Sequence, residues 1–208
     1  MPSLVASLFS YQQIISKFHL SGVARIRNNF TLMLLNHQHM RKIGLLSDTH
    51  NYLDDAVLKQ LDTCDEIWHA GDFGNIDIAN RLRALKPLKG VYGNIDGYDI
   101  RSEFSEQLLF YCEEVKVLMK HIGGYPGRYA PGAKNLIAKE QPRLFISGHS
   151  HILKIMYDDK LKCLHMNAGA AGLQGWHKVR TIIRFVVDGK ELSNCEVVEL
   201  GGRSKSSN

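Results

Sequence analysis

Residues of types that can bind metal ions follow a series of short apolar runs in this 208-residue sequence. They are Asp48, His50, Asp72, Asn94, His121, His149 and His151. Carboxylate and amide oxygens combined with imidazole nitrogens form a donor set that suits Mn, Fe, Zn or Ni rather than Ca or Mg alone. A carboxylate such as that of Asp72 can also bridge two ions with its two oxygens. The residue types therefore predict a site for divalent metal ions.

These side chains are far apart in the sequence, so a fold must bring them together. Short apolar runs predict strands at residues 42–46, 66–69, 88–92, 115–121 and 143–146. Helical patterns lie between several of them, at residues 56–61, 76–85 and 133–139. Each strand ends at or just before one or two of the seven candidates. Because ligands of open α/β sheets gather at the carboxyl ends of strands, we expect all seven at one edge.

Glycines precede three of the candidates, namely Gly71, Gly93 and Gly148. We interpret them as positions where the backbone turns sharply at the end of a strand. The second half of the chain has a different pattern, with strands predicted at 152–157, 161–166, 181–187 and 192–200, joined by turns into hairpins. The sequence therefore predicts an α/β protein: parallel strands with helices first, then a largely antiparallel sheet packed against them.

The formal charge of +5 comes from the two ends of the chain. Residues 1–39 carry three basic residues and no acidic one, and residues 203–208 carry two more basic residues. The other 21 basic residues equal the 21 acidic ones in number, so we do not predict a nucleic-acid-binding surface. The four cysteines form no C-x-x-C pair, and no apolar run approaches the roughly 18 residues of a membrane span. We expect a cytoplasmic protein with reduced thiols.

The composition changes at Met40, which sets the predicted domain boundaries. We expect residues 1–39 to be an extension outside the fold, residues 40–200 to form one domain, and residues 201–208 to be a disordered tail. We interpret the extension as the product of a wrongly assigned start, with Met40 or Met33 as the real one. The alternative is an organellar targeting segment, although such segments are usually richer in arginine.

The candidates occur in motifs that resemble those of the calcineurin-like metallophosphoesterases. The family series is D-x-H, G-D, G-N-x-[DEH], H and G-H-x-H. Here it reads Asp48-Thr49-His50, Gly71-Asp72, Gly93-Asn94-Ile95-Asp96, His121 and Gly148-His149-Ser150-His151. The resemblance covers residues 40–198 and is most similar to the small YfcE-like phosphodiesterases. It implies a four-layer αββα sandwich, in which two mixed sheets are flanked by helices.

The resemblance also implies the function and the roles of individual residues. The chain would be a hydrolase that cleaves a small phosphodiester, with phosphomonoesters as a second substrate class. It would use a water activated by two divalent ions, manganese being preferred over iron, zinc or nickel. The first ion would be held by Asp48, His50, Asp72 and His151, and the second by Asp72, Asn94, His121 and His149.

Further residues receive roles in the same reaction. Asn94 and His121 would help to fix the geometry facing the phosphate and so act as catalytic residues. By resemblance, Asp96 would hold a ligand in place without touching an ion. From its position before Gly71, His69 would do the same, with a purely structural histidine as the open alternative. Arg128 would pair with the substrate phosphate, with a solvated loop arginine as the alternative. We interpret His165 and His177 as structural or surface residues.

One departure from the family pattern affects the predicted chemistry. Many phosphomonoesterases of this family have a histidine after the G-N pair, whereas this chain has Ile95, which cannot transfer a proton. Two other functions stay open. One branch of the same fold serves as a non-catalytic subunit of the retromer coat, and some other relatives are nucleases. A homo-oligomer also stays open.

Overall fold

The computed structural model describes residues 40–203, so the predictions for residues 1–39 and 204–208 lie outside it. The described chain contains twelve strands and four helices. In chain order they are β1 (Arg41–Leu46), α3 (Asp55–Asp62), β2 (Glu66–His69), α4 (Ile76–Leu85), β3 (Leu88–Gly90), α5 (Tyr98–Glu103), β4 (Gln107–Cys112), β5 (Val115–Lys120), β6 (Gly124–Tyr125), β7 (Arg128–Tyr129), α6 (Ala133–Glu140), β8 (Leu144–Ile146), β9 (Leu153–Asp158), β10 (Cys163–Ala168), β11 (Val179–Asp188) and β12 (Glu191–Gly202).

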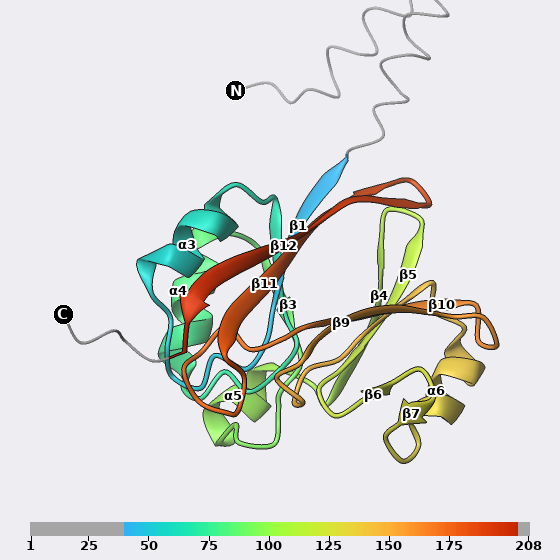
Figure 1. Ribbon diagram of the computed structural model, residues 1–208, viewed down its shortest axis with the longest axis horizontal. Coiled ribbons are helices and arrows are strands. Elements are labelled where there is room, and N and C mark those ends of the chain that lie inside the picture. The colour runs from blue at the N-terminus through green and yellow to red at the C-terminus, as the bar shows by residue number, and fades with distance from the viewer. Residues whose placement is uncertain (1–39, 204–208) are drawn as a thin grey trace, which may run out of the picture. The chain divides into compact units, whose positions relative to one another are not determined.

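Two five-stranded sheets form the centre of the domain. The first has the order β12-β11-β1-β2-β3, and the second has the order β4-β5-β8-β10-β9. Both are mixed. In the first sheet β1 pairs in parallel with β2 and antiparallel with β11. In the second sheet β8 pairs in parallel with β5 and β10, while β4 and β9 add antiparallel edges. Helices α3, α4 and α5 lie beside the first sheet and α6 beside the second (Figure 1). This is the predicted four-layer αββα sandwich.

Alternation along the strands explains why the sheets can be covered on both faces. In β1, Ile43 and Leu45 belong to the apolar core between the sheets, whereas Leu46 packs with the residues of α3 and α4. On the other side, Phe145 of β8 packs with Ile137 of α6. Successive strand side chains point to opposite faces, so each buried strand contributes to two cores.

The two longer helices of the first half begin at side chains that cap their free backbone N–H groups. The Asp54 carboxylate accepts from Val57 N, and the Asn75 side chain accepts from Ile78 N. The helix predicted at residues 56–61 thus begins at Asp55, and the two caps fix the ends of the loops that carry Asp48 and Asp72.

Most predicted elements are confirmed, but their division between the sheets is wrong. The hairpin of β11 and β12 joins the first sheet through β1, and β5 and β8 lie in the second sheet. The third strand ends at Gly90 rather than residue 92, and sequence reasoning missed α5, β4, β6 and β7. Strand β12 continues to Gly202, and Arg203 N donates to Lys178 O. The disordered tail was therefore predicted to start too early, at residue 201.

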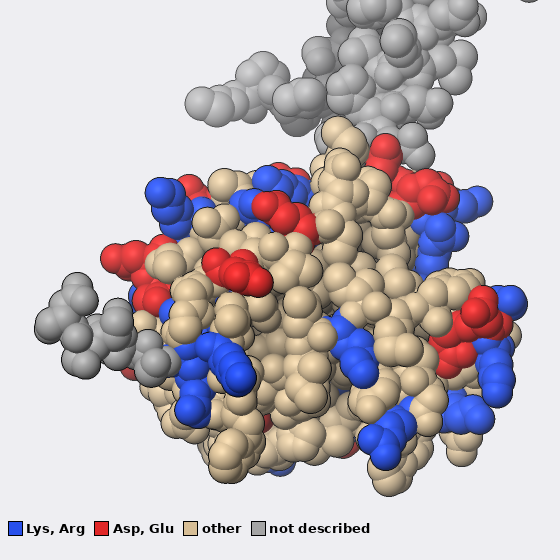
Figure 2. All heavy atoms as spheres, viewed as in Figure 1, with Lys and Arg blue, Asp and Glu red and all other residues tan. Residues whose placement is uncertain are grey.

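Basic and acidic side chains are interspersed on the face shown in Figure 2, without a continuous basic stripe. Within residues 40–203, no helix is long and apolar enough to cross a bilayer. The four cysteines are free, and only Cys195 is exposed. Cytoplasmic localisation and oligomeric state stay predictions.

Candidate metal centre

The structure brings six of the seven candidates into two groups of three. We call Asp48, His50 and His151 the Asp48 group, and Asp72, His121 and His149 the Asp72 group. Within each group one donor atom per residue lies within 4.8 Å of the others. The seventh candidate, Asn94, joins the Asp72 group because its Oδ1 lies 3.1 Å from His121 Nε2. All seven follow the carboxyl ends of β1, β2, β3, β5 and β8, as predicted.

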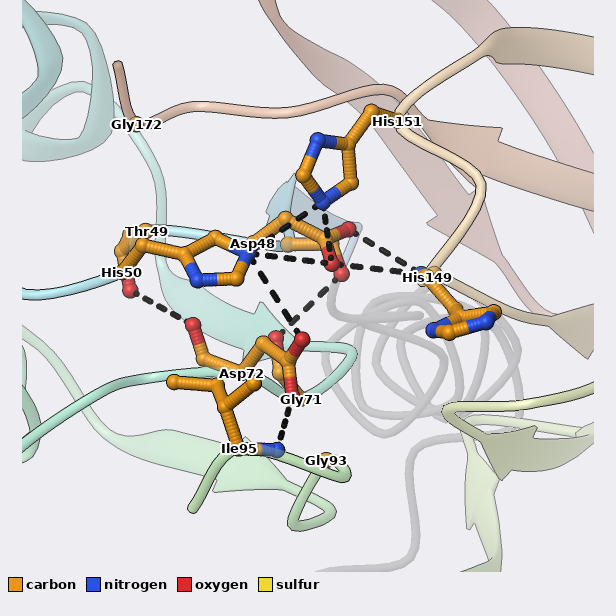
Figure 3. A network of polar contacts seen from close by, with 12 residues as sticks. Asp48, Thr49, His50, Gly71, Asp72, Gly93, Ile95, His149, His151 and Gly172 are labelled. Carbon is orange, nitrogen blue, oxygen red and sulfur yellow. Dashed lines mark hydrogen bonds and ion pairs between the residues drawn. The ribbon is translucent and has the colours of Figure 1, made fainter. Parts of the chain in front are cut away.

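Asp72 lies between the two groups. Its Oδ2 is 3.3 Å from His121 Nε2 in its own group and 3.6 Å from His50 Nε2 in the other. Figure 3 shows the side chains of Asp48, His50, Asp72 and His151 directed toward one another. The groups are also joined through the backbone, since His149 N donates to both oxygens of Asp48 at 3.2 and 3.1 Å.

The spacing of the donor atoms fits divalent ions. The Nε2 atoms of His50 and His151 are 3.2 Å apart, and His151 Nε2 is 3.3 Å from Asp48 Oδ1. Two ligands at roughly 2.1 Å from one ion, separated by angles of about 90 to 110°, lie about 3.0 to 3.4 Å apart. These two separations match that range, whereas His50 Nε2 lies farther from Asp48 Oδ1, at 4.0 Å. Oxygen and imidazole donors in this arrangement fit ions such as Mn, Fe, Zn or Ni.

Hydrogen bonding fixes which nitrogen of His121 is available. Its Nδ1 lies 2.7 Å from Ala70 O, and a carbonyl can only accept, so Nδ1 donates. In the neutral ring, Nε2 then keeps its lone pair and faces Asp72 and Asn94. A ligand histidine commonly has its other nitrogen held in this way.

Burial and neighbouring charges oppose each other across the centre. Burial lowers the pKa of His50, despite the nearby charges of Asp72 and Asp48. Burial also lowers the pKa of His121, but the hydrogen bond to Asp72 and the charge of Asp48 outweigh it and raise the pKa. The hydrogen bond to Asp48 raises the pKa of His151. Burial raises the pKa of Asp72, yet contact with His121 lowers it overall. Carboxylates and imidazoles thus stabilise one another here.

Five of the seven candidates have an unusual backbone conformation. Their φ angles are positive, at 55° for Asp48, 47° for His50, 58° for Asp72, 66° for His149 and 56° for His151. Positive φ is uncommon outside glycine and costs free energy, and such residues cluster at functional sites. The strain therefore supports the idea that these side chains are held in place for a task.

The three glycines that precede candidates are needed for different reasons. Gly71 has a φ of 96°, but Gly93 and Gly148 do not have positive φ. A Cβ at Gly93 would lie 2.0 Å from Asp72 Oδ1, and one at Gly148 would lie 2.1 Å from Ser47 Oγ. These two glycines are needed because the loops approach each other closely, while the ligands themselves make the turns.

Asp96 is placed as predicted, holding the loops of the Asp72 group. Its carboxylate accepts from Gly93 N at 2.7 Å, Gly74 N at 2.8 Å and Asp72 N at 3.0 Å. It therefore fixes the backbone on both sides of Asp72 and beside Asn94.

His69 also acts through the backbone. It is fully buried, and burial lowers its pKa to about 3, so the ring is neutral. Its Nδ1 accepts from Gly71 N, which leaves Nε2 to donate to Thr49 Oγ1 at 3.0 Å. Thr49 Oγ1 in turn lies 3.0 Å from Phe73 O. His69 thus ties the loop after β1 to the loop after β2.

Sequence reasoning missed two residues that hold the loops of the centre. Asn167 is buried, and its Nδ2 donates to Gly148 O at 2.8 Å, next to His149. Arg101 donates through Nε to Asp96 O and through Nη2 to the carbonyls of Gly93 and Asn94. Only their position in the fold identifies them, although Asn167 directly follows the strand predicted at residues 161–166.

Three other residues with predicted roles lie elsewhere or contact the centre differently. Arg128 lies in β7 and lines a hollow whose walls contain none of the seven candidates, and its contact with the substrate phosphate stays a prediction. His165 is buried with its Nε2 2.9 Å from Ser147 Oγ. The ring of His177 packs against that of His151, with centroids 5.5 Å apart, although sequence reasoning gave it only a structural or surface place.

Known proteins share this sequence pattern and this fold. The chain is 31% identical over 135 residues to a probable metallophosphoesterase of Methanocaldococcus jannaschii, covering 62% of this chain and 67% of the relative. The fold is similar to a novel archaeal phosphodiesterase, with a TM-score of 0.58, 23% identity and 76% and 99% of the two chains covered. It is also similar to Vps29 of Chaetomium thermophilum, with a TM-score of 0.63, 16% identity and 76% and 96% covered.

The family model for the calcineurin-like phosphoesterase superfamily domain matches residues 40–190, which include all seven candidates and both sheets up to the turn after β11. The match spans the greater part of the chain, and the candidate centre lies at the strand ends that it covers. The chain therefore belongs to the calcineurin-like phosphoesterase superfamily.

Proposed function

We propose that this metallophosphoesterase hydrolyses small phosphodiesters at a centre of two divalent ions. The observation that carries the proposal is the position of Asp72, whose Oδ2 lies within 3.6 Å of a histidine nitrogen in each group. One ion would be held by the Asp48 group with Asp72, and the other by the Asp72 group with Asn94. When bound, two such ions lower the pKa of a water and neutralise charge on the phosphate.

Hydrolysis would form a bond between the oxygen of a water and phosphorus while one ester P–O bond breaks. The products are a phosphomonoester and an alcohol, whose oxygen takes up a proton. The chain's own contribution is to hold the centre rigid. Asp72 Oδ1 accepts from Ile95 N at 3.0 Å, and Asp96 fixes the same loop, so the donors are preorganised.

Ile95 supports diesters with good leaving groups as the preferred class. It is 44% exposed, and Figure 3 shows its side chain beside Asp72. No proton can come from an isoleucine, so expulsion of a poor leaving group lacks the general acid that a histidine there would supply. Phosphomonoesters of alkyl alcohols are therefore proposed as a slower, second class.

The test is turnover of bis(p-nitrophenyl) phosphate by protein loaded separately with Mn, Fe, Zn or Ni. We expect hydrolysis that depends on the added metal, with Mn the most effective, and we expect it to disappear on chelation. The proposal would be contradicted if the protein bound two ions of each metal in turn and hydrolysed the diester with none of them.

A non-catalytic scaffold is the second candidate, and the fold similarity to Vps29 favours it. Strand β9, at the edge of the second sheet, exposes Ile155, Met156 and Tyr157, which a protein partner could cover. A scaffold would bind metal weakly and cleave no activated diester at any metal concentration.

Nuclease activity is a weaker alternative, because the basic residues of the domain do not exceed the acidic ones. Plasmid DNA in the same assay tests it.

A further inference from the structure

A hollow of about 310 Å³ opens directly beside the Asp72 group. Asn94 and His121 form part of its wall, together with Tyr92, Arg101 and Ile122. Its size is at the lower end of the range for small-molecule sites. Because two candidate metal ligands line it, a group attached to a phosphate at the centre can enter the hollow without crossing the protein.

Two other residues of the wall, Arg101 and Tyr92, form a cation–π pair. The guanidinium carbon of Arg101 lies 4.5 Å from the centre of the Tyr92 ring. Hydrogen bonds from Arg101 Nε and Nη2 to the carbonyls of residues 93, 94 and 96 hold the guanidinium in this position. Planar guanidinium and aromatic groups are surfaces on which flat rings stack. Ile122, 42% exposed, adds an apolar side chain.

The charges on the wall are mostly neutralised. Lys120 Nζ forms an ion pair with Glu106, and the hydrogen bond from Lys120 keeps the pKa of Glu106 below its ordinary value. The carboxylate is thus ionised and paired. Within residues 40–203, Arg101 Nη1 makes no hydrogen bond, so it can donate to an acceptor in the hollow. The hollow therefore offers a ligand the Arg101 and Tyr92 pair and one cationic donor.

We propose that this hollow binds the second ester arm of the phosphodiester, the arm that does not leave, and that this arm carries a flat ring. A nucleoside and an aryl alcohol both offer such a ring. This inference depends on the proposed phosphodiesterase function and adds the chemical class of the substrate. A base or ring stacked on the Arg101 and Tyr92 pair would bind more tightly than a puckered ring of similar size.

The experiment uses three diesters that share p-nitrophenolate as leaving group and differ only in the second arm. The arms are cyclohexyl, phenyl and thymidine 5′-yl. We expect kcat/KM for the phenyl or the thymidine ester to exceed that of the cyclohexyl ester by about 10-fold, the order that ring stacking supports. The phenyl and thymidine esters then distinguish an aryl substrate from a nucleoside one. Equal values for all three would overturn the inference, whereas no turnover of any of them would instead overturn the proposed function.

Two variants test which residues produce the selectivity for a flat ring. Tyr92→Leu removes the ring but keeps an apolar side chain, and Arg101→Lys keeps the charge but removes the plane. For each variant we compare kcat/KM for the phenyl or thymidine ester with kcat/KM for the cyclohexyl ester. We expect this flat-to-cyclohexyl ratio to fall toward one. Because the leaving group is common, a general loss of activity cancels in this ratio. Arg101 is exposed, so its variant stays informative if Tyr92→Leu does not fold.

Matched controls lie outside the hollow. Tyr98→Leu replaces a tyrosine that is 84% exposed, and Arg83→Lys replaces an arginine that lies 5.8 Å from the ring of Phe104. Both controls should keep the wild-type ratio. A ratio that is unchanged in Tyr92→Leu and Arg101→Lys, or lowered equally in the controls, would contradict the assignment of the hollow.

Discussion

The Asp72 group and the Asp48 group contain the same residue types but are held in place differently. Around Asp72, hydrogen bonds fix the donors: Asp96 accepts three backbone N–H groups, and His121 is anchored to Ala70 O. In the Asp48 group, the rings of His50 and His151 pack edge to face at 5.1 Å, and His151 contacts His177 in the same way. Edge-to-face histidine rings occur in both groups, since those of His121 and His149 pack at 5.3 Å, and Asp48 also accepts hydrogen bonds from His149 N. The difference is the Asp96 carboxylate, which adds three backbone hydrogen bonds around Asp72.

The difference indicates how the two ions would respond to mutation. When a hydrogen-bond partner is removed, the one ligand that it held loses its position. When a packing contact is removed, several neighbouring residues shift a little instead. We therefore expect the Asp72 group to be the more sensitive half. The five predictions below test this comparison, beginning with the largest effect.

Asp72→Ala and Asp48→Ala should differ in how many ions they lose. Since Asp72 lies between the groups, its removal should cost both ions and at least about 10³-fold in turnover, a loss of several kcal/mol of transition-state stabilisation. Asp48→Ala should lose one ion and keep the other. Metal analysis of the purified variants gives the counts, and Asp159→Ala, at an exposed turn, is the control. Two ions retained by Asp72→Ala would show that Asp72 does not bridge.

Ile95→His and Ile152→His compare the positions that follow a ligand in each half. We expect wild-type protein to cleave bis(p-nitrophenyl) phosphate much faster than an alkyl phosphomonoester. Ile95→His should narrow the gap by raising the monoester rate, because general acid catalysis contributes about 10² to 10⁴ in rate. Ile152 is 60% exposed and follows His151, so its variant should leave the gap unchanged. Comparable wild-type rates on both substrates would mean that another group supplies the proton.

Asp96→Asn should weaken the Asp72 group selectively. The amide keeps one acceptor and places an NH₂ group against backbone donors, so at least one bond at 2.7 to 3.0 Å is lost. Loss of such supporting partners costs about 10- to 100-fold in metal affinity or activity. Competitive chelation, followed for each ion, measures the change. Asp99→Asn, exposed on α5, is the matched control, and equal weakening of both ions would remove the distinction between the halves.

Asp54→Ala should mainly reduce stability behind the Asp48 group. Asp54 caps α3 and forms two bonds of 2.9 Å with Arg180, which is 3% exposed and donates to Ala171 O. Loss of the cap costs about 1 kcal/mol, and the unpaired buried cation adds to it, so we expect about 3 kcal/mol in the free energy of unfolding. Asn75→Ala, which removes only a cap, should cost about 1 kcal/mol. Denaturant unfolding measures both, and equal losses would show that the ion pair contributes nothing.

The same pair predicts a dependence on pH. Burial raises the pKa of Asp54, but hydrogen bonds from Arg180 and Val57 and the charge of Arg180 outweigh it, so the pKa lies below its ordinary value of 3.8. A carboxyl group with a lowered pKa contributes stability above its unfolded pKa and loses it as the pH falls. The difference between wild type and Asp54→Ala should therefore shrink below about pH 4.

The sequence predicted which side chains come together better than it predicted the sheets. Metal-ligand residues at strand ends are a local pattern, and any α/β sheet with parallel strands brings such ends together, so all seven candidates were found without knowing the strand order. The pairing of β11 with β1 is set by contacts between residues more than a hundred positions apart, which no local pattern contains. Short elements such as β6 and β7 depend on their surroundings for the same reason.

The supporting residues were also hard to predict. Asp96 was identified only through its place in the family motif. Asn167 and Arg101 act on carbonyls of other loops, and their residue types are common at the surface, so only the folded structure shows what they hold. The positive φ angles of the ligands were hidden for a similar reason, because they are imposed by the surrounding loops.

The most direct test of the central claim is a titration of metal-free protein with Mn²⁺ in which bound metal and bis(p-nitrophenyl) phosphate turnover are measured in the same samples. A centre in which Asp72 serves both groups predicts two ions per chain and turnover that rises mainly with the second equivalent. Full turnover with a single ion bound, or two bound ions without turnover, would contradict it.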